Sequence, residues 1–141
     1  MACVWRSSYS ETDGNAAVNA VLVDRAFESW PQVRLVAPTL LWSESASALS
    51  QLRWRGEITD EQLGAALQRL LAAPIFPVPS AELVIEAAAL ARELGWAKTY
   101  DAEYVVLARR LTSPLLTVDA RLAAAVRGRV TVVSPADVGA R

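Results

Sequence analysis

Two aspartates stand at positions where a parallel sheet could bring them together. Asp101 lies where an apolar helix should begin, and Asp119 lies where a short apolar strand should end. In an α/β fold both places face the carboxyl edge of the sheet, which is where ligands bind. Two carboxylates that converge there repel each other, so they need a cation or a proton between them.

The composition narrows the chemistry that these acids can support. The sequence has no histidine, and Cys3 is its one cysteine. A Ser-His-Asp triad, a Cys-His pair, a histidine-ligated zinc site and an internal disulfide are therefore excluded. Mg²⁺ takes oxygen ligands and needs only two or three carboxylates, and a bound metal lowers the pKa of water. A metal held by acids is thus the most credible hydrolytic route in this chain.

Length and charge limit the number of domains and the way in which the chain could contact nucleic acid. The chain has 141 residues, of which 53% are hydrophobic, which indicates one domain with a substantial core. Its net charge of −1 means that any contact with nucleic acid must use a local patch. Only Lys98 among the 14 basic residues is lysine. Arginine suits bidentate phosphate contacts, although arginine with abundant alanine also follows from a GC-rich genome.

Nothing in the sequence indicates a membrane segment or a secretion signal. No apolar run approaches the roughly 20 residues of a transmembrane helix. The first residues lack the long apolar region of a signal peptide. We therefore expect a cytoplasmic protein without membrane contact.

Apolar spacing and capping residues predict an alternation of short strands and helices. Thr39 is the expected N-cap of the second helix, Thr59 begins a capping box with Gln62, and Ser80 is the expected cap of the fourth helix. Prolines limit the strand near residue 75, so it should not be central. The predicted helices are 14–30, 40–55, 60–71, 80–94, 100–111 and 120–126, and the predicted strands are 2–5, 33–36, 74–78, 115–118 and 130–133.

This alternation predicts an α/β fold with a small, mainly parallel sheet. We expect one domain over residues 1–141, with an irregular or divergent start over 1–13 and a loose tail over 134–141. The second and third helices should form an αα-hairpin. Five tryptophans and this apolar hairpin exceed the needs of a small core, so we expect the chain to form a homodimer or bind a partner through helices.

A third acid, Glu44, lies in an early turn of the second helix. Each of the three acids also has a purely structural interpretation. Asp101 and Asp119 could be helix N-caps, a position that aspartate fills well, and Glu44 could be a solvated helix residue. Taken one at a time, these residues do not decide between the two interpretations.

From Leu35 onward the chain resembles the PIN-domain ribonucleases, in particular the bacterial VapC-type toxins. Three segments occur in the order and at the separations typical of that family. They are Leu35-Val36-Ala37-Pro38-Thr39-Leu40-Leu41-Trp42-Ser43-Glu44, Thr99-Tyr100-Asp101-Ala102-Glu103-Tyr104-Val105-Val106-Leu107-Ala108 and Pro114-Leu115-Leu116-Thr117-Val118-Asp119-Ala120-Arg121-Leu122.

The resemblance implies a three-layer α/β/α fold, a Mg²⁺ or Mn²⁺ site of clustered acids, and hydrolysis of single-stranded or loop RNA. Glu44, Asp101 and Asp119 match three of the four characteristic acids, and Thr117 matches the hydroxyl residue that usually precedes the last acid. A toxin of this type would be restrained by a cognate VapB-like antitoxin. Residues Arg6, Arg109, Arg110 and Arg121 are candidate phosphate contacts, although each could equally be a solvated charge.

The fourth acid of the family pattern is missing. Family members begin with an apolar strand that runs directly into an aspartate, whereas this chain has no acid between Ala2 and Ser8. The start of the chain is therefore divergent or altered. A second hypothesis follows, in which the chain is a catalytically impaired PIN-fold protein that only binds a protein partner or RNA.

Overall fold

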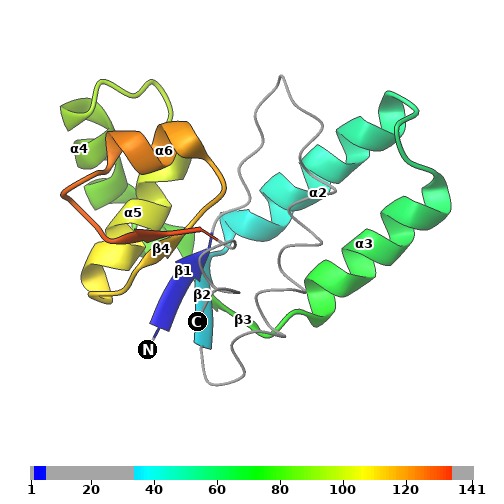
Figure 1. The fold of residues 1–141 in the computed structure, drawn as a ribbon, viewed down its shortest axis with the longest axis horizontal. Helices are drawn as coiled ribbons and strands as arrows, with labels where there is room; N and C mark the ends of the chain where they lie inside the picture. The colour runs from blue at the N-terminus through cyan, green and yellow to red at the C-terminus, as the bar shows by residue number, and fades with distance from the viewer. Residues whose placement is uncertain (1, 6–33, 135–141) are drawn as a thin grey trace.

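The computed structural model describes residues 2–5 and 34–134, and their strands form one parallel sheet. The spatial order of the five strands is β3-β2-β1-β4-β5 (Figure 1). The strands are short, as predicted, and span Ala2–Trp5 (β1), Arg34–Pro38 (β2), Ile75–Val78 (β3), Leu115–Leu116 (β4) and Val132–Val133 (β5).

β1 is the point at which the strand order changes direction, since β2 and β3 lie on one side of it and β4 and β5 lie on the other. This strand pairs with β2 on one side and with β4 on the other, where Val4 lies opposite Leu115 and Trp5 lies opposite Leu116. In open α/β sheets the crevice for ligands lies outside the carboxyl ends of the strands at such a reversal. The edge at which β1, β2 and β4 end is therefore where a site should form.

The helices lie on two sides of the sheet. In Figure 1, α4, α5 and α6 gather on one side, and the pair α2–α3 lies on the other. The connections from β2 to β3 and from β3 to β4 cross the sheet in opposite directions, so right-handed crossovers place their helices on opposite faces. The helices span Leu40–Trp54 (α2), Asp60–Ala72 (α3), Val84–Glu93 (α4), Tyr100–Arg110 (α5) and Ala120–Ala125 (α6), and a 3-10 turn, η1, spans Ser80–Glu82.

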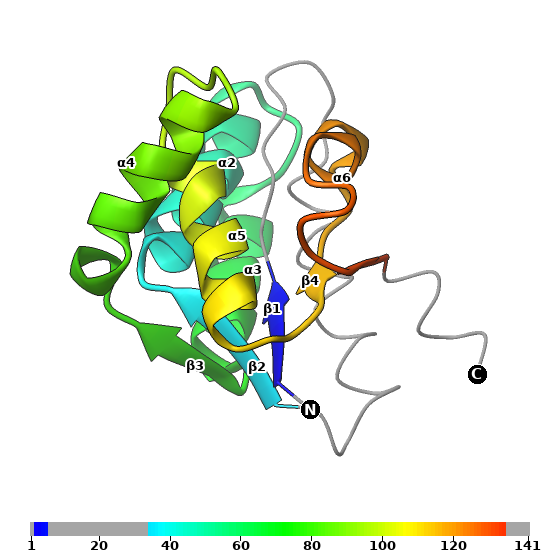
Figure 2. The same cartoon turned by 90° about the vertical axis from the view of Figure 1, so that its left-hand side faces the viewer.

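Helix α5 forms the centre of the core. It lies between α4 and the sheet (Figure 2), and it contacts β1, β2 and β4. Residues 102–108 are all buried, so this helix is enclosed on nearly every side. The sequence accounts for this burial, because the run from Val105 to Ala108 is entirely apolar.

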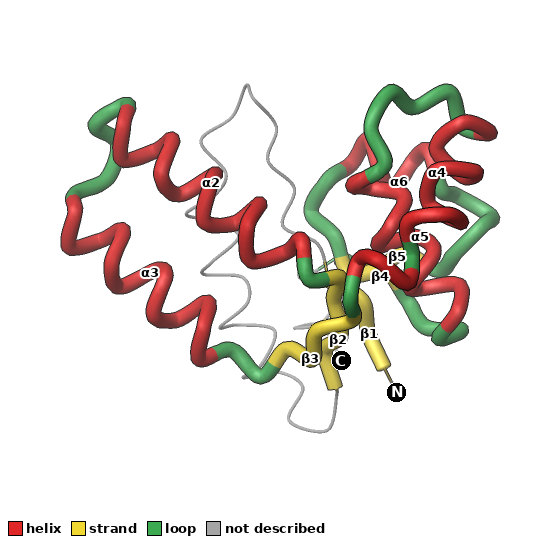
Figure 3. Tube along the Cα trace, turned by 180° about the vertical axis from the view of Figure 1, so that it is seen from behind, coloured by secondary structure: helices red, strands yellow, loops and turns green. Residues whose placement is uncertain are grey.

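Helices α2 and α3 form the predicted αα-hairpin, which extends away from the sheet (Figure 3). It has a small core of its own, in which Ala48, Leu49 and Leu52 are buried. Gly56 follows α2 with a φ of 76°, a left-handed conformation that favours glycine and ends the helix as predicted.

The predicted fold class, an α/β sandwich with a small parallel sheet, is confirmed. β3 is an edge strand, as its prolines indicated. One predicted cap is wrong, because Ser80 begins η1 rather than α4, which starts at Val84. Thr39 occupies the predicted N-cap position of α2, but its side chain makes no capping bond to that helix, and its hydroxyl bonds Ser80 instead.

Some predictions fall on other parts of the chain. The helix expected over 14–30, the irregular stretch over 6–13 with Arg6, and the tail from 135 to 141 lie outside the described residues. The extent of the single domain therefore stays a prediction. In the part of the chain that the structure describes, no helix is both long enough and apolar enough to cross a membrane.

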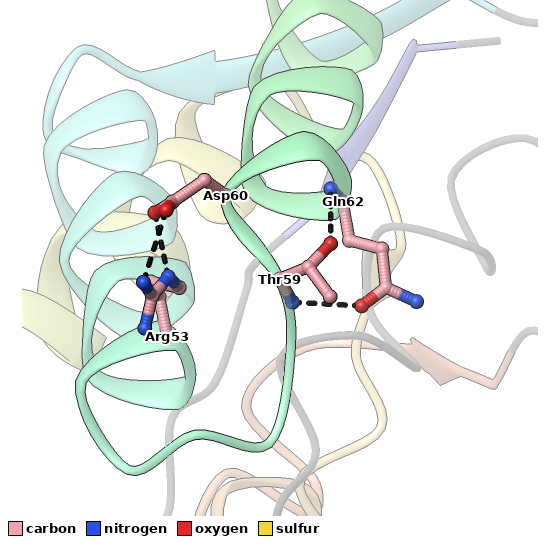
Figure 4. A network of polar contacts seen from close by, with 4 residues as sticks. All are labelled: Arg53, Thr59, Asp60 and Gln62. Carbon is pink, nitrogen blue, oxygen red and sulfur yellow. Dashed lines mark hydrogen bonds and ion pairs between the residues drawn. The ribbon is translucent and has the colours of Figure 1, made fainter.

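The junction of α2 and α3 is held by two polar motifs (Figure 4). Thr59 and Gln62 form the predicted capping box: the Gln62 amide donates to Thr59 Oγ1 at 3.1 Å, and the Thr59 amide donates to Gln62 Oε1 at 2.8 Å. Arg53 pairs with Asp60 through two bonds, of 2.6 and 2.9 Å. Hydrogen bonding from the Arg53 guanidinium lowers the pKa of the Asp60 carboxyl.

These two motifs should differ in their effect on stability. Thr59→Ala removes the oxygen that satisfies a helix amide, so it should lower the free energy of unfolding by about 1 kcal/mol. Arg53→Ala should have a smaller effect that shrinks further in high salt, because the ion pair is exposed. Urea unfolding at low and high salt measures both. Equal losses for the two variants at both salt concentrations would contradict this expected difference.

Candidate active site

Three predicted site residues come from elements that meet at the carboxyl edge of the sheet. β2 leads directly into α2, which carries Glu44, and β4 is followed by Asp119 at the start of α6. Helix α5 precedes β4 and runs antiparallel to the strands, so its first turn, with Asp101, lies at the same edge. The topology thus places all three acids at one edge.

A buried tyrosine joins α2 to α5. Tyr104 is fully buried, and its hydroxyl donates to Glu44 Oε2 at 3.0 Å. Tyr104 lies one turn after Asp101 on α5, and long side chains on a helix lean toward its N-terminus. The Glu44 carboxylate is therefore held on the Asp101 side of α5. Glu44 is half-buried and hydrogen-bonded, so the interpretation as a solvated residue is wrong.

Sequence reasoning did not assign a role to Tyr104. The signal was a hydroxyl directly before the apolar run from Val105 to Ala108, placed three residues after an acid and thus on the same helix face.

Asp119 is both an N-cap and a candidate ligand. Its Oδ1 accepts from the amides of Arg121 and Leu122 at 2.8 and 3.0 Å, which confirms the predicted cap of α6. Thr117 Oγ1 accepts from the Asp119 amide at 3.0 Å, and only 3% of Thr117 is exposed. These bonds fix the backbone and the carboxylate of Asp119 at the end of β4. Thr117 therefore positions Asp119.

Asp101 is not a cap. The N-cap position of α5 belongs to Thr99, and Asp101 is the second residue of the helix, half-buried. A carboxylate in the first turn is favoured by the positive end of the helix dipole. The interpretation of Asp101 as an N-cap is therefore wrong.

The acids share an edge, but they do not form a closed cage. Among residues 2–5 and 34–134, no three Asp, Glu or Cys side chains stand close enough to hold a metal ion together. The hydrogen bond from Tyr104 ties Glu44 to α5, the helix whose first turn carries Asp101. Asp119 approaches from β4.

The predicted phosphate contacts are divided between the two ends of the fold. Arg121 lies exposed in the first turn of α6, beside Asp119. Arg109 and Arg110 lie in the last turn of α5, at the opposite edge of the sheet from the acids. Arg110 binds the Glu86 carboxylate and donates to the Glu82 carbonyl at 2.8 Å. Of the described candidates, only Arg121 thus lies beside an acid.

A further acid, Glu103, was missed by sequence reasoning. Only 5% of it is exposed, and its Oε2 has no hydrogen-bond partner. Burial raises the pKa of the Glu103 carboxyl, and a hydrogen bond from Ser80 opposes that shift. The Ser80 amide donates to Thr39 Oγ1 at 3.1 Å, and the Thr39 hydroxyl donates to Ser80 Oγ at 3.3 Å.

Comparisons with known proteins agree on the fold. The family model described as "PIN domain" matches residues 12–128. PAE2754 from Pyrobaculum aerophilum has a similar crystal structure, with a TM-score of 0.64 and 19% identity over 100% of both chains. VapBC2 from Rickettsia felis, solved bound to a DNA fragment from its promoter, has a TM-score of 0.63 and 13% identity over 95% of this chain and 98% of that chain. No curated protein matches the sequence.

Loss of the Tyr104 hydroxyl should cost stability. Tyr104→Phe removes a bond to a half-buried carboxylate, so we expect a loss of about 1–2 kcal/mol in the free energy of unfolding. Tyr100→Phe, at an exposed position of the same helix, is the matched control and should have almost no effect. Chemical denaturation measures both variants. Equal stability of Tyr104→Phe and the control would mean that the bond to Glu44 contributes nothing.

Stability should depend on pH through Glu103. Because its pKa is raised in the folded state, the stability that it contributes is fully present below the pKa of the unfolded chain, about 4.3. That contribution is lost as pH rises through the folded-state pKa. Glu103→Gln cannot titrate, so its stability relative to the unaltered chain should increase between about pH 4 and pH 8. Urea unfolding in EDTA tests this, and a difference that stays constant across this range would refute it.

Proposed function

Because this chain belongs to the PIN-domain family, we propose that it is a metal-dependent endoribonuclease of the VapC toxin type. Members of the family are typically metal-dependent nucleases. The observation that supports the proposal most is the hydrogen bond from Tyr104 to Glu44, which ties an acid on α2 to the helix that carries Asp101. In the proposed mechanism, acids held in this way at the carboxyl edge of the sheet bind the metal ion that activates water.

We propose that Glu44, Asp101 and Asp119 hold Mg²⁺ or Mn²⁺. Their carboxylate oxygens are the donors that these ions prefer, and Mg²⁺ usually keeps several waters and binds one or two carboxylates directly. Such an ion would not need direct bonds to all three acids. Glu44 or Asp101 could bind it directly, and Asp119 could contact it through a bound water. The metal would supply an activated water and would stabilise charge on the attacked phosphate.

The remaining residues would orient these ligands and the substrate. Tyr104 donates to one oxygen of Glu44 and so limits the orientation of that carboxylate. Thr117 holds the amide of Asp119, and two α6 amides hold its Oδ1. Arg121 is the proposed contact to an RNA phosphate, because it is exposed beside Asp119. Arg109 and Arg110 could only contact RNA that extends to the other edge of the sheet.

We further propose a homodimer restrained by a VapB-like antitoxin in the cytoplasm. Trp54, at the end of α2, is 86% exposed, and Leu71 on α3 is exposed as well, which is more apolar surface than the hairpin needs for its own packing. The R. felis structure is of VapBC2 bound to promoter DNA, which is consistent with a paired assembly.

A second candidate function is a PIN-fold protein without catalysis that binds a protein partner or RNA. The observation that favours it is the absence of an acid in β1. Trp5 lies opposite Leu116, so β1 ends beside β4 at the reversal of strand order, and no carboxylate occurs from Ala2 to Trp5. The missing acid would lower the affinity of the site for metal.

Cleavage of an RNA with exposed loops separates these two functions. We expect weak cleavage by the unaltered chain in Mg²⁺ or Mn²⁺, no cleavage in EDTA, and more cleavage by Trp5→Asp or Arg6→Asp. Asp101→Asn should abolish cleavage in the most active of these backgrounds, because it removes the charge that holds the metal. Glu61→Gln is the matched control, since Glu61 is likewise the second residue of its helix.

Three outcomes would contradict or alter the proposed nuclease function. Cleavage that survives EDTA or Asp101→Asn would contradict the metal-dependent mechanism. Vigorous cleavage by the unaltered chain would show that another group, such as Glu11 or Asp13, completes the site. A folded chain that neither cleaves RNA nor binds Mn²⁺ with the acid restored would leave only the binding function.

A further inference from the structure

A groove between α4 and α5 has no part in the proposed acid site. The two helices lie side by side (Figure 2), and they run in opposite directions, because Arg110 in the last turn of α5 binds Glu86 in the first turn of α4. The groove has a volume of about 690 Å³, and the buried residues Leu90 and Val106 lie at its base. This volume is in the range of ligand pockets, so the groove has room for a bound group.

The two carboxylates that line the groove are already paired with arginines. Arg110 binds the Glu86 carboxylate and also donates to the Glu82 carbonyl at 2.8 Å. Arg129, which follows α6, donates to Glu93 Oε1 at 2.6 Å. These contacts join α4 to its neighbours, and they neutralise the acids of the groove.

Two further arginines line the groove without an acid to neutralise them. Arg92 and Arg109 are exposed, and within residues 2–5 and 34–134 neither side chain forms an ion pair or a hydrogen bond. Each lies in the last turn of its helix, where the helix dipole favours a cation, so its presence alone assigns no role. Because both line the same groove, however, their charges add there and attract an anion.

The spacing of these arginines suits a chain of phosphates better than a single phosphate. Because α4 and α5 are antiparallel, Arg92 lies toward the start of α5, whereas Arg109 lies near its end. Arg92 also lies six residues after Glu86, about 9 Å along α4. Proteins that bind single-stranded nucleic acid use a positively charged groove of this kind to follow the backbone.

We propose that the α4–α5 groove binds the backbone of single-stranded RNA through Arg92 and Arg109, outside the acid site. This inference rests on the proposed function, in which RNA is the substrate, and it assigns that substrate a second contact. Asp101 and Arg109 lie eight residues apart, about 12 Å along α5, so a strand bound at the acids reaches the groove within a few nucleotides. A chain with a net charge of −1 needs such a local patch to hold RNA.

The experiment measures the binding of a labelled single-stranded RNA of about 12 nucleotides to the full chain by fluorescence anisotropy. It is done in EDTA over a range of salt concentrations, so that no metal ion at the acid site contributes. We expect Arg92→Ala and Arg109→Ala each to weaken binding several-fold and to reduce the slope of log affinity against log salt by about 0.7, the value for one phosphate contact. Arg109→Lys keeps the charge, so it should keep the slope.

The matched control is Arg69→Ala. Arg69 is likewise exposed in the last turn of its helix, α3, which lies on the other side of the sheet, and its side chain forms no ion pair within the described part of the chain. This substitution removes the same charge and should leave the affinity and the slope unchanged. An equal loss in Arg69→Ala, or an unchanged slope in both groove variants, would overturn the proposal. Urea unfolding checks that all variants are folded.

An acidic protein segment is the other occupant that these charges would attract, and competition separates it from RNA. A glutamate peptide with as many charges as the RNA should displace the labelled strand only weakly. Displacement as effective as that by unlabelled RNA would overturn the proposal in favour of a protein partner.

Failure of the proposed nuclease function would look different. Asp101→Asn should not weaken RNA binding in EDTA, because the groove does not include that acid. A chain that never cleaves RNA but shows the reduced slopes of Arg92→Ala and Arg109→Ala would support the groove alone. A chain that cleaves RNA while both variants keep the full slope would overturn the groove alone.

Discussion

The enclosure of α5 between α4 and the sheet is the constraint on which the rest of the structure depends. A helix buried on nearly every side cannot move without opening the core, so each group that it presents has a fixed position. Its first turn reaches the carboxyl edge of the sheet, where α2 and α6 begin. Asp101, Glu103 and Tyr104 are therefore anchored to the best-packed part of the molecule, and the other elements are positioned relative to them.

The neighbouring elements reach α5 through polar contacts rather than through apolar packing alone. Tyr104 on α5 donates a hydrogen bond to Glu44 on α2. Asp119 is fixed separately, by the Thr117 hydroxyl and the amides of α6. Hydrogen bonds are directional, so they determine where an acid points in a way that apolar contacts do not. These bonds therefore fix the orientation of Glu44 and of Asp119 at this edge.

Local patterns were sufficient to predict most elements, because apolar spacing, prolines and glycines act over a few residues. The capping box at Thr59, the end of α2 at Gly56 and the edge position of β3 were all predicted correctly. Contacts between distant residues defeated the same reasoning. Thr39 and Ser80 both looked like N-caps, but they lie 41 residues apart in the chain and bond each other. The role of Tyr104 likewise depends on Glu44, a distant partner that no local pattern specifies.

The central claim is that Glu44, Asp101 and Asp119 form one site for a divalent metal ion. The most direct measurement is the anomalous diffraction of a crystal of the full chain soaked in Mn²⁺. We expect one ion at the carboxyl edge of the sheet, within about 2.0–2.2 Å of a carboxylate oxygen of Glu44 or Asp101, with Asp119 in contact directly or through water. An ion bound elsewhere with this edge empty, under conditions in which Mn²⁺ saturates the protein, would contradict it.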